Sequence, residues 1–494
     1  MPTRARRKDE CVGRKLGWWR RGLRARIRGL MKPRFADVEA LLARVAEEHA
    51  VPGLASAVMI EGALAHVATH GWRDRERGLP MTDATPSRWY SISKPITSLA
   101  LAQLVAQGRL RWDDVVSRLV PEVRFADPVA TERADIRDCL LHRTGLPDGN
   151  WTWWQAPSDP RALLQRLPHF PCSAGFRVGH HYQNLGFTLL GEVFRACGTT
   201  WHQAIQDLLQ PLGIHPMTRL AEFVASDRMV GYGPNGFLPA RPSADFDFEG
   251  IAPASAVCGS ILELAKLGSA LAYGGRDLLP TAVWADVIQP ELAIGATPWE
   301  EMLQPAVALA GRSLVYRGEW VIDWAGGWQG YTSRLLAMPS RRIAVCTLAN
   351  RTSSSAADLL AFSLLDRAAG WEPRPWAERF LDLKRTQRRA ARQRLTDRLA
   401  RPRRTWWASG ACGRFRHGGY GDIVVAYPDR LRFRDIDLAL LAHPDGSFSA
   451  VADEFDLGEF YFDLRPEVHA GEVVAWLANP ELHGPPCRFE RVAD

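Results

Sequence analysis

The chain has 494 residues, 46% hydrophobic and 24% charged, which suits two or three globular domains and excludes a disordered, collagen-like or coiled-coil protein. No run of 18 apolar residues occurs, so no membrane span is predicted. The net charge of +7 comes from basic runs in residues 1–30 and 384–404, and the rest of the chain is acidic. Both runs are typical of solvated segments, and we expect no nucleic-acid partner.

Helical and strand patterns alternate at the start of the chain. Apolar residues recur at helical spacing over residues 35–49 and again over residues 91–107. Between these helices, two apolar runs at 54–60 and 63–68 are separated by Glu61-Gly62 and predict a β-hairpin. Helical and irregular segments then follow for more than a hundred residues.

Strand patterns return late in the first two thirds of the chain. Residues 314–321, 331–338 and 343–348 each predict a strand, and residues 356–369 predict a helix. Strands therefore open and close a domain predicted over residues 35–370, and helices fill its middle. This order predicts an α+β fold, in which both ends of the domain build one antiparallel sheet that helices flank.

The ends of the chain differ in composition from this domain. Residues 1–34 predict a disordered basic arm, and residues 371–405 predict a basic linker that is partly helical. From 406 to 494, short apolar runs with Gly, Pro and Asp turns predict a small all-β domain.

The cysteines and the N-terminus bear on location and metal binding. The eight cysteines are scattered, without C-x-x-C or zinc-like Cys/His spacing, so no metal site is predicted. The basic N-terminus lacks the apolar core of a secretory signal, so we expect a cytoplasmic protein.

The first chemical motif is Ser91-Ile-Ser-Lys94, at the start of a predicted helix. Residues three apart share a helix face, so the Lys94 amine can reach the Ser91 hydroxyl. A serine nucleophile needs a base, and burial can lower the pKa of a lysine enough for it to serve. The alternative is that Ser91 caps the helix and Lys94 lies on the surface.

Two further segments carry residues of the same kind of chemistry. Tyr182-Gln-Asn184 precedes a predicted helix, which would place a phenol and an amide side by side. Trp324-Ala-Gly326-Gly327 lies in a strand-like segment, where glycines permit close approach of a ligand to the backbone.

With these motifs in this order, the chain resembles the serine β-lactamase-like hydrolases, which include class C β-lactamases, penicillin-binding proteins and family VIII carboxylesterases. The resemblance covers roughly residues 35–370. Besides the three motifs, Leu140-Leu-His-Arg-Thr-Gly-Leu-Pro147 is similar to a conserved family segment. The resemblance implies the β-lactamase/transpeptidase-like fold, with a helical subdomain packed on the sheet. The C-terminal segment resembles the small lipocalin-like barrel of D-aminopeptidase-type members, where it either shapes the site or serves packing or oligomerisation.

The resemblance also implies roles for the site residues. Ser91 is the acylated nucleophile, while Lys94 and Tyr182 share the proton transfers, and which of the two is the base stays open. Asn184 orients the substrate and bonds Lys94. The backbone N–H groups of Ser91 and Gly327 form the oxyanion hole.

The third motif departs from the family pattern. Trp324 stands where the family usually has Lys or His, and Gly326 completes a Trp-x-Gly variant similar to that of family VIII carboxylesterases. Losing the cation removes a partner for a substrate carboxylate, such as penicillins carry, and favours neutral substrates. The alternative is that Trp324 is a core residue.

Three functions follow from these observations. The first is a serine hydrolase of small esters, acting through an acyl-enzyme on Ser91. The second is a D-aminopeptidase or penicillin-recognising hydrolase, and the third is an inactive binding protein with the same fold. The predicted partner is a small-molecule ester or amide. No P-loop or dinucleotide motif occurs, so no cofactor is predicted, and the sequence leaves the oligomeric state open.

Overall fold

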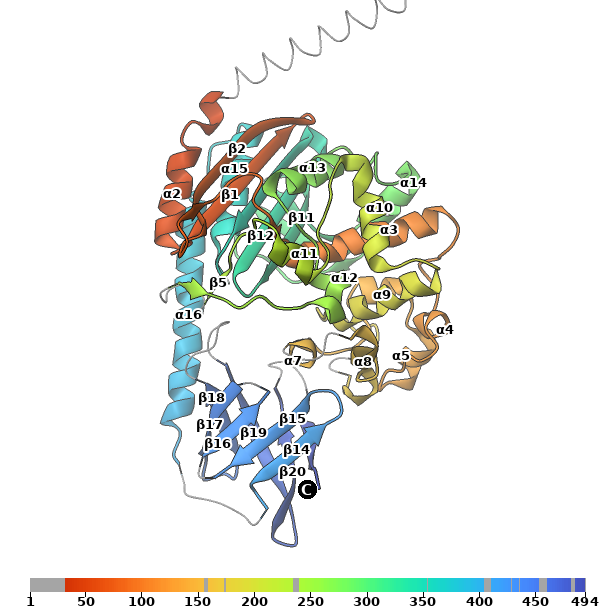
Figure 1. Cartoon of the computed structure of the whole chain (residues 1–494), viewed down its shortest axis with the longest axis vertical. Coiled ribbons are helices and arrows are strands. Elements are labelled where there is room, and N and C mark those ends of the chain that lie inside the picture. The colour runs from red at the N-terminus through yellow and green to blue at the C-terminus, as the bar shows by residue number, and fades with distance from the viewer. Residues whose placement is uncertain are drawn as a thin grey trace, which may run out of the picture.

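The computed structural model shows a large α+β domain, a long helix and a small β-barrel (Figure 1). None of the described helices is long and apolar enough to cross a membrane. Residues 1–31 lie outside the described residues, so the basic arm stays a prediction. The structure describes residues 32–493 except 155–158, 173–174, 234–239, 353, 404–409, 428, 435, 453–459 and 481–484.

A nine-stranded antiparallel sheet forms the centre of the large domain, in the order β3-β2-β1-β13-β12-β11-β10-β9-β8. The first hairpin and the last strands meet where β1 pairs with β13, which confirms the prediction that both ends of the domain build one sheet. In chain order the strands are β1 (Gly53–Ile60), β2 (Ala63–Asp74), β3 (Leu79–Pro80), β8 (Leu292–Ala293), β9 (Met302–Ala308), β10 (Gly311–Tyr316), β11 (Glu319–Trp328), β12 (Tyr331–Met338) and β13 (Ile343–Ala349).

One predicted strand is wrong. The segment 314–321 is not a single strand, because Arg317 and Gly318 turn the chain between β10 and β11. Both residues have positive φ, +50° and +85°, which is the geometry of a two-residue hairpin turn. The apolar residues on either side of this turn hid it in the sequence pattern.

Helices cover both faces of the sheet (Figure 1). The helices α2 (Val38–Glu48) and α15 (Ala356–Ala369) pack on one face, and α13 (Ile261–Ala272) packs on the other. The helix α3 (Ser93–Ala106) lies between the sheet and a helical lobe. The remaining helices of the domain are α4 (Val116–Leu119), α5 (Pro128–Arg133), α6 (Ile136–Leu140), α7 (Asn150–Trp153), α8 (Pro160–Leu164), α9 (Leu185–Ala196), α10 (Trp201–Leu209), α11 (Leu220–Ala225), α12 (Ala252–Ser255) and α14 (Thr281–Ile288).

Short strand pairs and the C-terminal barrel complete the fold. Two small two-stranded sheets pair β4 (Ser87–Arg88) with β7 (Cys258–Gly259) and β5 (Tyr232–Gly233) with β6 (Arg241–Pro242). The predicted all-β domain is a closed eight-stranded barrel whose interior is filled by buried apolar side chains. Its strands are β14 (Gly413–His417), β15 (Gly421–Ala426), β16 (Arg430–Phe433), β17 (Ile436–Ala442), β18 (Phe448–Ala452), β19 (Phe460–His469), β20 (Glu472–Ala478) and β21 (Cys487–Arg491).

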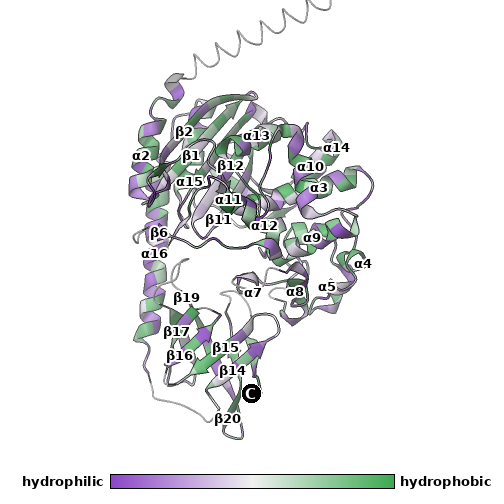
Figure 2. Ribbon diagram, viewed as in Figure 1, coloured by the Kyte–Doolittle hydropathy of each residue, from purple (hydrophilic) through white to green (hydrophobic). Residues whose placement is uncertain are grey.

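The helix α16 (Trp376–Ala400) joins the two domains and runs beside both of them (Figure 1). It has 25 residues and is mostly hydrophilic along its length (Figure 2), so the segment predicted as a partly helical linker is largely one helix. Its first turn is anchored to the sheet domain. The fully buried Asp366 of α15 accepts hydrogen bonds from Tyr316, Arg317 and the indole of Trp376.

We expect Asp366→Ala to lower the free energy of unfolding by about 3–5 kcal/mol, because it leaves the Arg317 guanidinium without its buried carboxylate. Urea denaturation followed by circular dichroism measures the change. The matched control is Asp382→Ala on α16, whose exposed carboxylate pairs with the exposed Arg385. The control should change the free energy by less than about 0.5 kcal/mol. Equal stability of the two variants would contradict the anchoring role of Asp366.

Candidate active site

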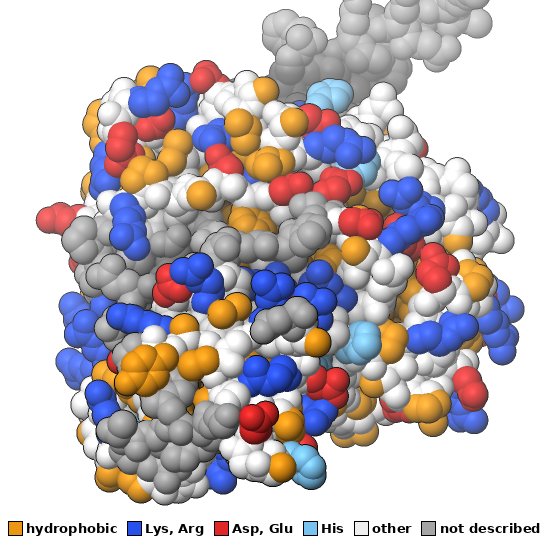
Figure 3. All heavy atoms as spheres, turned by 60° about the horizontal axis from the view of Figure 1, so that its bottom comes forward, with side chains coloured by type: hydrophobic (Ala, Val, Ile, Leu, Met, Phe, Trp, Pro, Cys, Tyr) orange, Lys and Arg blue, Asp and Glu red, His pale blue; other side chains and the backbone are white. Residues whose placement is uncertain are grey.

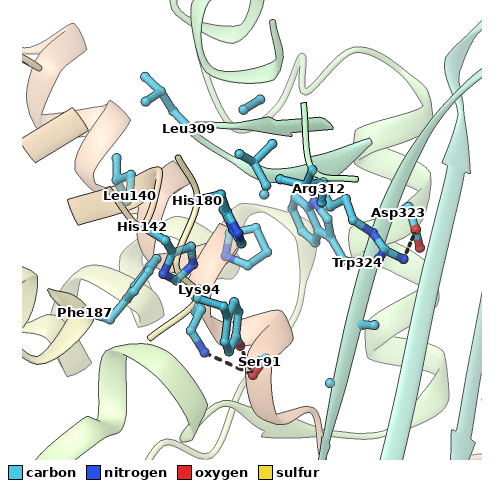
Figure 4. Close-up of a pocket in the computed structure, with 18 of the residues that line it drawn as sticks. Ser91, Lys94, Leu140, His142, His180, Phe187, Leu309, Arg312, Asp323 and Trp324 are labelled. Carbon is cyan, nitrogen blue, oxygen red and sulfur yellow. Dashed lines mark hydrogen bonds and ion pairs between the residues drawn. The ribbon is translucent and has the colours of Figure 1, made fainter. Parts of the chain in front are cut away.

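A cavity of about 390 Å³ opens where the start of α3, the strand β11 and the loop before α9 meet. Figure 4 shows Ser91 and Lys94 at one end of it and Leu309 toward the other. Most of the lining is apolar or glycine. The lining residues are Ser91, Lys94, Pro95, Leu140, His142, His180, Tyr182, Phe187, Ile294, Val307, Ala308, Leu309, Gly311, Arg312, Asp323, Trp324, Ala325, Gly326 and Gly327.

Ser91 lies in the middle of a 3₁₀ turn, Tyr90–Ile92, directly before α3. The turn is strained, because the buried Tyr90 has a φ of +47°, in a region that aromatic residues rarely occupy. The Tyr90 hydroxyl donates a hydrogen bond of 2.8 Å to the carbonyl of Gln329, which helps to hold this conformation. Ser91 does not cap α3, since no side chain accepts a capping hydrogen bond there. The alternative role as a helix cap is therefore not supported.

Lys94 is buried beside Ser91, with only 4% of its surface exposed. Its Nζ lies 3.0 Å from Ser91 Oγ and 3.4 Å from the carbonyl oxygen of Ala254. Burial lowers the pKa of Lys94 well below its ordinary value of 10.5. A surface position for Lys94 is excluded, and a larger fraction of its amine is neutral at pH 7 than in an exposed lysine.

Tyr182 approaches the same serine from the other side. Its hydroxyl donates a hydrogen bond of 2.7 Å to Ser91 Oγ, and Lys94 Nζ lies 4.6 Å from the centre of its ring. The residue is 44% exposed at the mouth of the cavity. Desolvation nevertheless raises the pKa of Tyr182 to about 12, so its phenol is protonated at neutral pH. The serine therefore lies between an amine that can accept a proton and a phenol that can donate one.

Asn184 is not where the resemblance to known hydrolases implied. It is buried before α9, and its Nδ2 donates a hydrogen bond of 3.2 Å to Oδ1 of Asn150 at the start of α7. The expected hydrogen bond between Asn184 and Lys94 is wrong, because the Lys94 amine bonds the carbonyl of Ala254 instead. Asn184 is also absent from the cavity lining. Its amide braces α7 against the Tyr182 segment.

The residues of the third motif, Trp324, Gly326 and Gly327, lie on β11 and line the cavity. A Cβ at Gly326 would lie 2.0 Å from the Trp89 carbonyl oxygen and 3.0 Å from the Ser91 nitrogen, so no side chain fits there. Gly326 therefore lets β11 pack directly on the Tyr90–Ile92 turn that carries Ser91. Gly327 follows Gly326 on β11 and also lines the cavity. Trp324 is 2% exposed and forms part of the cavity wall, so it is both a core residue and a cavity residue.

The cationic groups around the cavity are few. The described residues that line the cavity include one lysine, Lys94, and one arginine, Arg312. Arg312 forms an ion pair with the buried Asp323, and Figure 4 shows its side chain directed toward Asp323 and away from Ser91. The Asp323 carboxylate also pairs with Arg334. Among the described lining residues, no lysine or arginine other than Lys94 is therefore directed toward the serine.

His142 is another polar residue of the cavity lining. It is buried, its Nδ1 accepts a hydrogen bond of 3.2 Å from the Gln183 N–H, and its ring centre lies 4.7 Å from that of Tyr182. Burial holds the pKa of His142 well below 6.5, so the ring is neutral and its proton is on Nε2. This supports a hydrogen-bonding role rather than general base catalysis. The apolar cavity residues Ile294, Val307 and Leu309 come from loops and strands without a motif, and no sequence signal identified them.

A serine held between a buried lysine and a tyrosine, beside an antiparallel sheet flanked by helices, is the arrangement that a serine nucleophile requires. The chain belongs to the beta-lactamase family, whose sequence description matches residues 24–369. Family members are hydrolases, and they include esterases, penicillin-binding proteins, β-lactamases and a D-aminopeptidase.

Two curated relatives illustrate the range of this family. Unguisins hydrolase ungD' of Aspergillus campestris is 26% identical over 342 residues, which cover 64% of this chain and 63% of the relative. Esterase EstB of Burkholderia gladioli is 32% identical over 202 residues, which cover 36% of this chain and 50% of the relative. The chain thus spans about half to two thirds of the length of these relatives.

Solved structures share the fold. An octameric penicillin-binding protein homologue from Pyrococcus abyssi superposes with a TM-score of 0.62 at 19% identity, covering 92% of this chain and 99% of that chain. EstCE1, a hydrolase with promiscuous acyltransferase activity, superposes with a TM-score of 0.53 at 20% identity. The superposition covers 66% of this chain and 97% of EstCE1. At these identities the likeness concerns the fold alone, and it confirms the β-lactamase/transpeptidase-like architecture.

Proposed function

We propose that this protein hydrolyses neutral esters through an acyl-enzyme on Ser91. One observation carries the proposal: Ser91 Oγ lies within hydrogen-bonding distance of both Lys94 Nζ and the Tyr182 hydroxyl, at 3.0 and 2.7 Å, at the end of a mostly apolar cavity. Burial lowers the pKa of Lys94, which favours the neutral amine that a base requires, and raises the pKa of Tyr182 to about 12, which keeps the phenol protonated.

The first half of the reaction acylates Ser91. The neutral Lys94 amine takes the proton of the Ser91 hydroxyl while the oxygen forms a bond to the ester carbonyl carbon. The tetrahedral intermediate then breaks its bond to the alcohol oxygen, and the Tyr182 phenol gives that oxygen a proton. Transfer of a proton from the Lys94 ammonium to the Tyr182 phenolate restores both groups. The products are the free alcohol and an ester of Ser91.

The second half of the reaction releases the acid. A water molecule attacks the Ser91 ester and loses a proton to Lys94, and the Lys94 ammonium gives that proton to the Ser91 oxygen as its bond to the acyl carbon breaks. In both halves we assign the oxyanion hole to the backbone N–H groups of Ser91 and Gly327. The close approach of β11 to the Ser91 turn at Gly326 supports this assignment.

The cavity favours an apolar, uncharged substrate. Leu140, Val307, Leu309 and Trp324 contribute apolar wall, and the Arg312 guanidinium is engaged in an ion pair with Asp323. A substrate carboxylate would lose its water shell there without gaining a cationic partner, which costs several kcal/mol. A cavity of about 390 Å³ has the size of a small-molecule site. We therefore assign esters of short acyl or aryl groups as substrates.

Intact-mass analysis tests the proposal. The full chain is mixed with nitrophenyl esters, D-aminoacyl anilides and a fluorescent penicillin, quenched after milliseconds to seconds, and weighed. We expect a mass gain equal to the acyl group of the ester, located on Ser91 by peptide mapping. Turnover of the ester without any acyl adduct on Ser91, or no turnover of any ester, would overturn the proposal.

Tyr182→Phe tests the proton donor. We expect kcat to fall about 100-fold for an alkyl ester, whose poor leaving group needs the phenol proton, and less than tenfold for a nitrophenyl ester, whose leaving group does not. The hydrogen bond to Ser91 Oγ is lost in the variant while the ring is kept. Steady-state assays on the two esters measure the contrast. Equal losses on both esters would contradict the assigned role of Tyr182.

A second candidate is hydrolysis of amides of D-amino acids. A D-aminopeptidase of Brucella anthropi is 25% identical over 223 residues, 41% of this chain, and the C-terminal barrel has the topology expected for such members. Release of nitroaniline from D-aminoacyl anilides, in the same mass experiment, would favour this candidate. Acylation by esters alone would leave the first proposal in place.

A further inference from the structure

We propose that Arg434, directly after strand β16 in the C-terminal barrel, is a positioning residue for the active site in the other domain. It acts on residues 149–154, which contain α7 and which we call the α7 segment. This inference rests on the proposed function only in its activity readout, since the contacts themselves are structural.

The Arg434 guanidinium donates to backbone carbonyls on both sides of the domain boundary. Its Nε bonds the Trp151 oxygen at 2.7 Å, and its Nη2 bonds the Thr152 oxygen at 3.4 Å and the Tyr420 oxygen of the barrel at 3.1 Å. The preceding Phe433 contacts the Trp151 ring edge-on, with centres 6.0 Å apart. The flat, five-donor guanidinium can serve several acceptors at once, which a lysine cannot do.

The α7 segment connects this arginine to two of the active-site motifs. Asn150 Oδ1 accepts the hydrogen bond from Asn184, two residues after Tyr182. The rings of Trp153 and Trp154 lie 5.2 and 5.4 Å from that of Trp328, which directly follows Gly327 on β11. A shift of the segment would therefore reach both the proton donor and the oxyanion hole.

The segment depends on outside support. The helix α7 has only four residues, too few to be stable through its own hydrogen bonds. Besides Arg434, Arg166 donates a hydrogen bond of 2.7 Å to the Thr152 oxygen from within the large domain. Two arginines from opposite sides thus hold the same turn of backbone, and one of them belongs to the barrel.

A separate contact keeps the barrel docked on the helical lobe. The hairpin residues Gly418 and Gly419 pack so closely on His169 and Phe170 that a Cβ at either glycine would lie within about 2.5 Å of those rings. The Tyr420 and Phe170 rings also meet edge-on, 5.1 Å apart. Figure 1 shows α7 facing the barrel. On the outer surface at the barrel end, Figure 3 shows basic and acidic side chains intermixed. Loss of the Arg434 side chain should therefore loosen the α7 segment without releasing the barrel.

The test compares Arg434→Ala with Arg432→Ala in the full chain. Arg432 lies two residues earlier on β16, and its exposed guanidinium pairs with the exposed Asp437. Hydrogen-exchange mass spectrometry of peptides covering 149–154 and 327–331 reads the position of the segment without any substrate. Steady-state hydrolysis of a nitrophenyl ester reads the effect on the site.

For Arg434→Ala we expect at least tenfold faster exchange in the α7 segment and about tenfold lower kcat/KM, because small misplacements of catalytic groups are costly. Arg432→Ala should leave both unchanged within twofold. Unchanged exchange in Arg434→Ala, unchanged kcat/KM despite faster exchange, or equal effects of both variants would each overturn the inference. Should Arg434→Ala fail to fold, Arg434→Lys replaces it. For this variant we expect smaller changes in the same directions, which are faster exchange in the α7 segment and lower kcat/KM. An inactive wild-type enzyme would contradict the proposed function, whereas the exchange result would still decide the role of Arg434.

Discussion

Replacing Ser91 with alanine should lower kcat for ester hydrolysis at least about 10⁴-fold, because nucleophile, base and acid act as one unit and removal of the nucleophile disables all of it. The Lys94 amine and the Tyr182 hydroxyl would remain, each having lost its hydrogen bond to the serine oxygen. They could assist direct attack by water only weakly, since no covalent intermediate would form.

Among the described residues that line the cavity, Ser91 is the one serine, and none is a threonine or a cysteine. His142 lines the same cavity, but it is buried and its Nδ1 already accepts the Gln183 N–H. Residual activity should therefore come from binding and the oxyanion hole alone.

Three measurements check this prediction. Steady-state rates give the loss in kcat, rapid quenching shows whether a burst of alcohol precedes turnover, and a fluorophosphonate probe reports the nucleophile directly. The matched control is Ser340→Ala, which removes an exposed hydroxyl that bonds Glu319 and is not among the cavity-lining residues. The control should label and turn over normally. Labelling of Ser91→Ala at another residue, or a rate within tenfold of the wild type, would contradict the acyl-enzyme on Ser91. Absence of labelling in the wild type would favour an inactive binding protein.

The local chemistry of the site could be predicted from sequence because it depends on short spacings. Three residues on a helix bring Lys94 to Ser91 regardless of the surrounding fold, and the structure has the two atoms 3.0 Å apart. Tyr182 was placed by the resemblance to known hydrolases, since 91 residues separate it from the serine and no periodicity connects them.

What could not be predicted depends on long-range packing. The amide of Asn184 is turned toward Asn150 by the position of α7, and that position depends in part on Arg434, more than 280 residues further along the chain. Apolar cavity residues such as Leu309 also carry no motif, because an apolar side chain that lines a cavity has the same pattern as one that lies in a core. The single strand predicted across the Arg317-Gly318 turn failed for a local reason, since no Asn-Gly or Asp-Gly pair marks that hairpin.

Replacing Lys94 with methionine should lower kcat/KM for ester hydrolysis about 10³-fold, the usual contribution of a general base. Methionine fills the volume of the lysine stem and suits the buried position, so the fold should persist. The control is Lys266→Met on α13, which removes an exposed amine that bonds the Gly213 carbonyl. A thermal melt of both variants separates loss of the base from loss of the fold.

The pH dependence of the wild-type enzyme decides whether the base is the amine or the phenol. A base acts in its deprotonated form, so kcat/KM falls as the pH drops below the pKa of that group. For Lys94 this pKa lies well below 10.5, so kcat/KM should level off at a lower pH than an ordinary lysine would require. For Tyr182, with a pKa of about 12, only about one phenolate in 10⁵ exists at pH 7, and kcat/KM would keep rising tenfold per pH unit through pH 10. A plateau below pH 10 that disappears in Lys94→Met would identify the amine, whereas a rise that continues through pH 10 would exclude it.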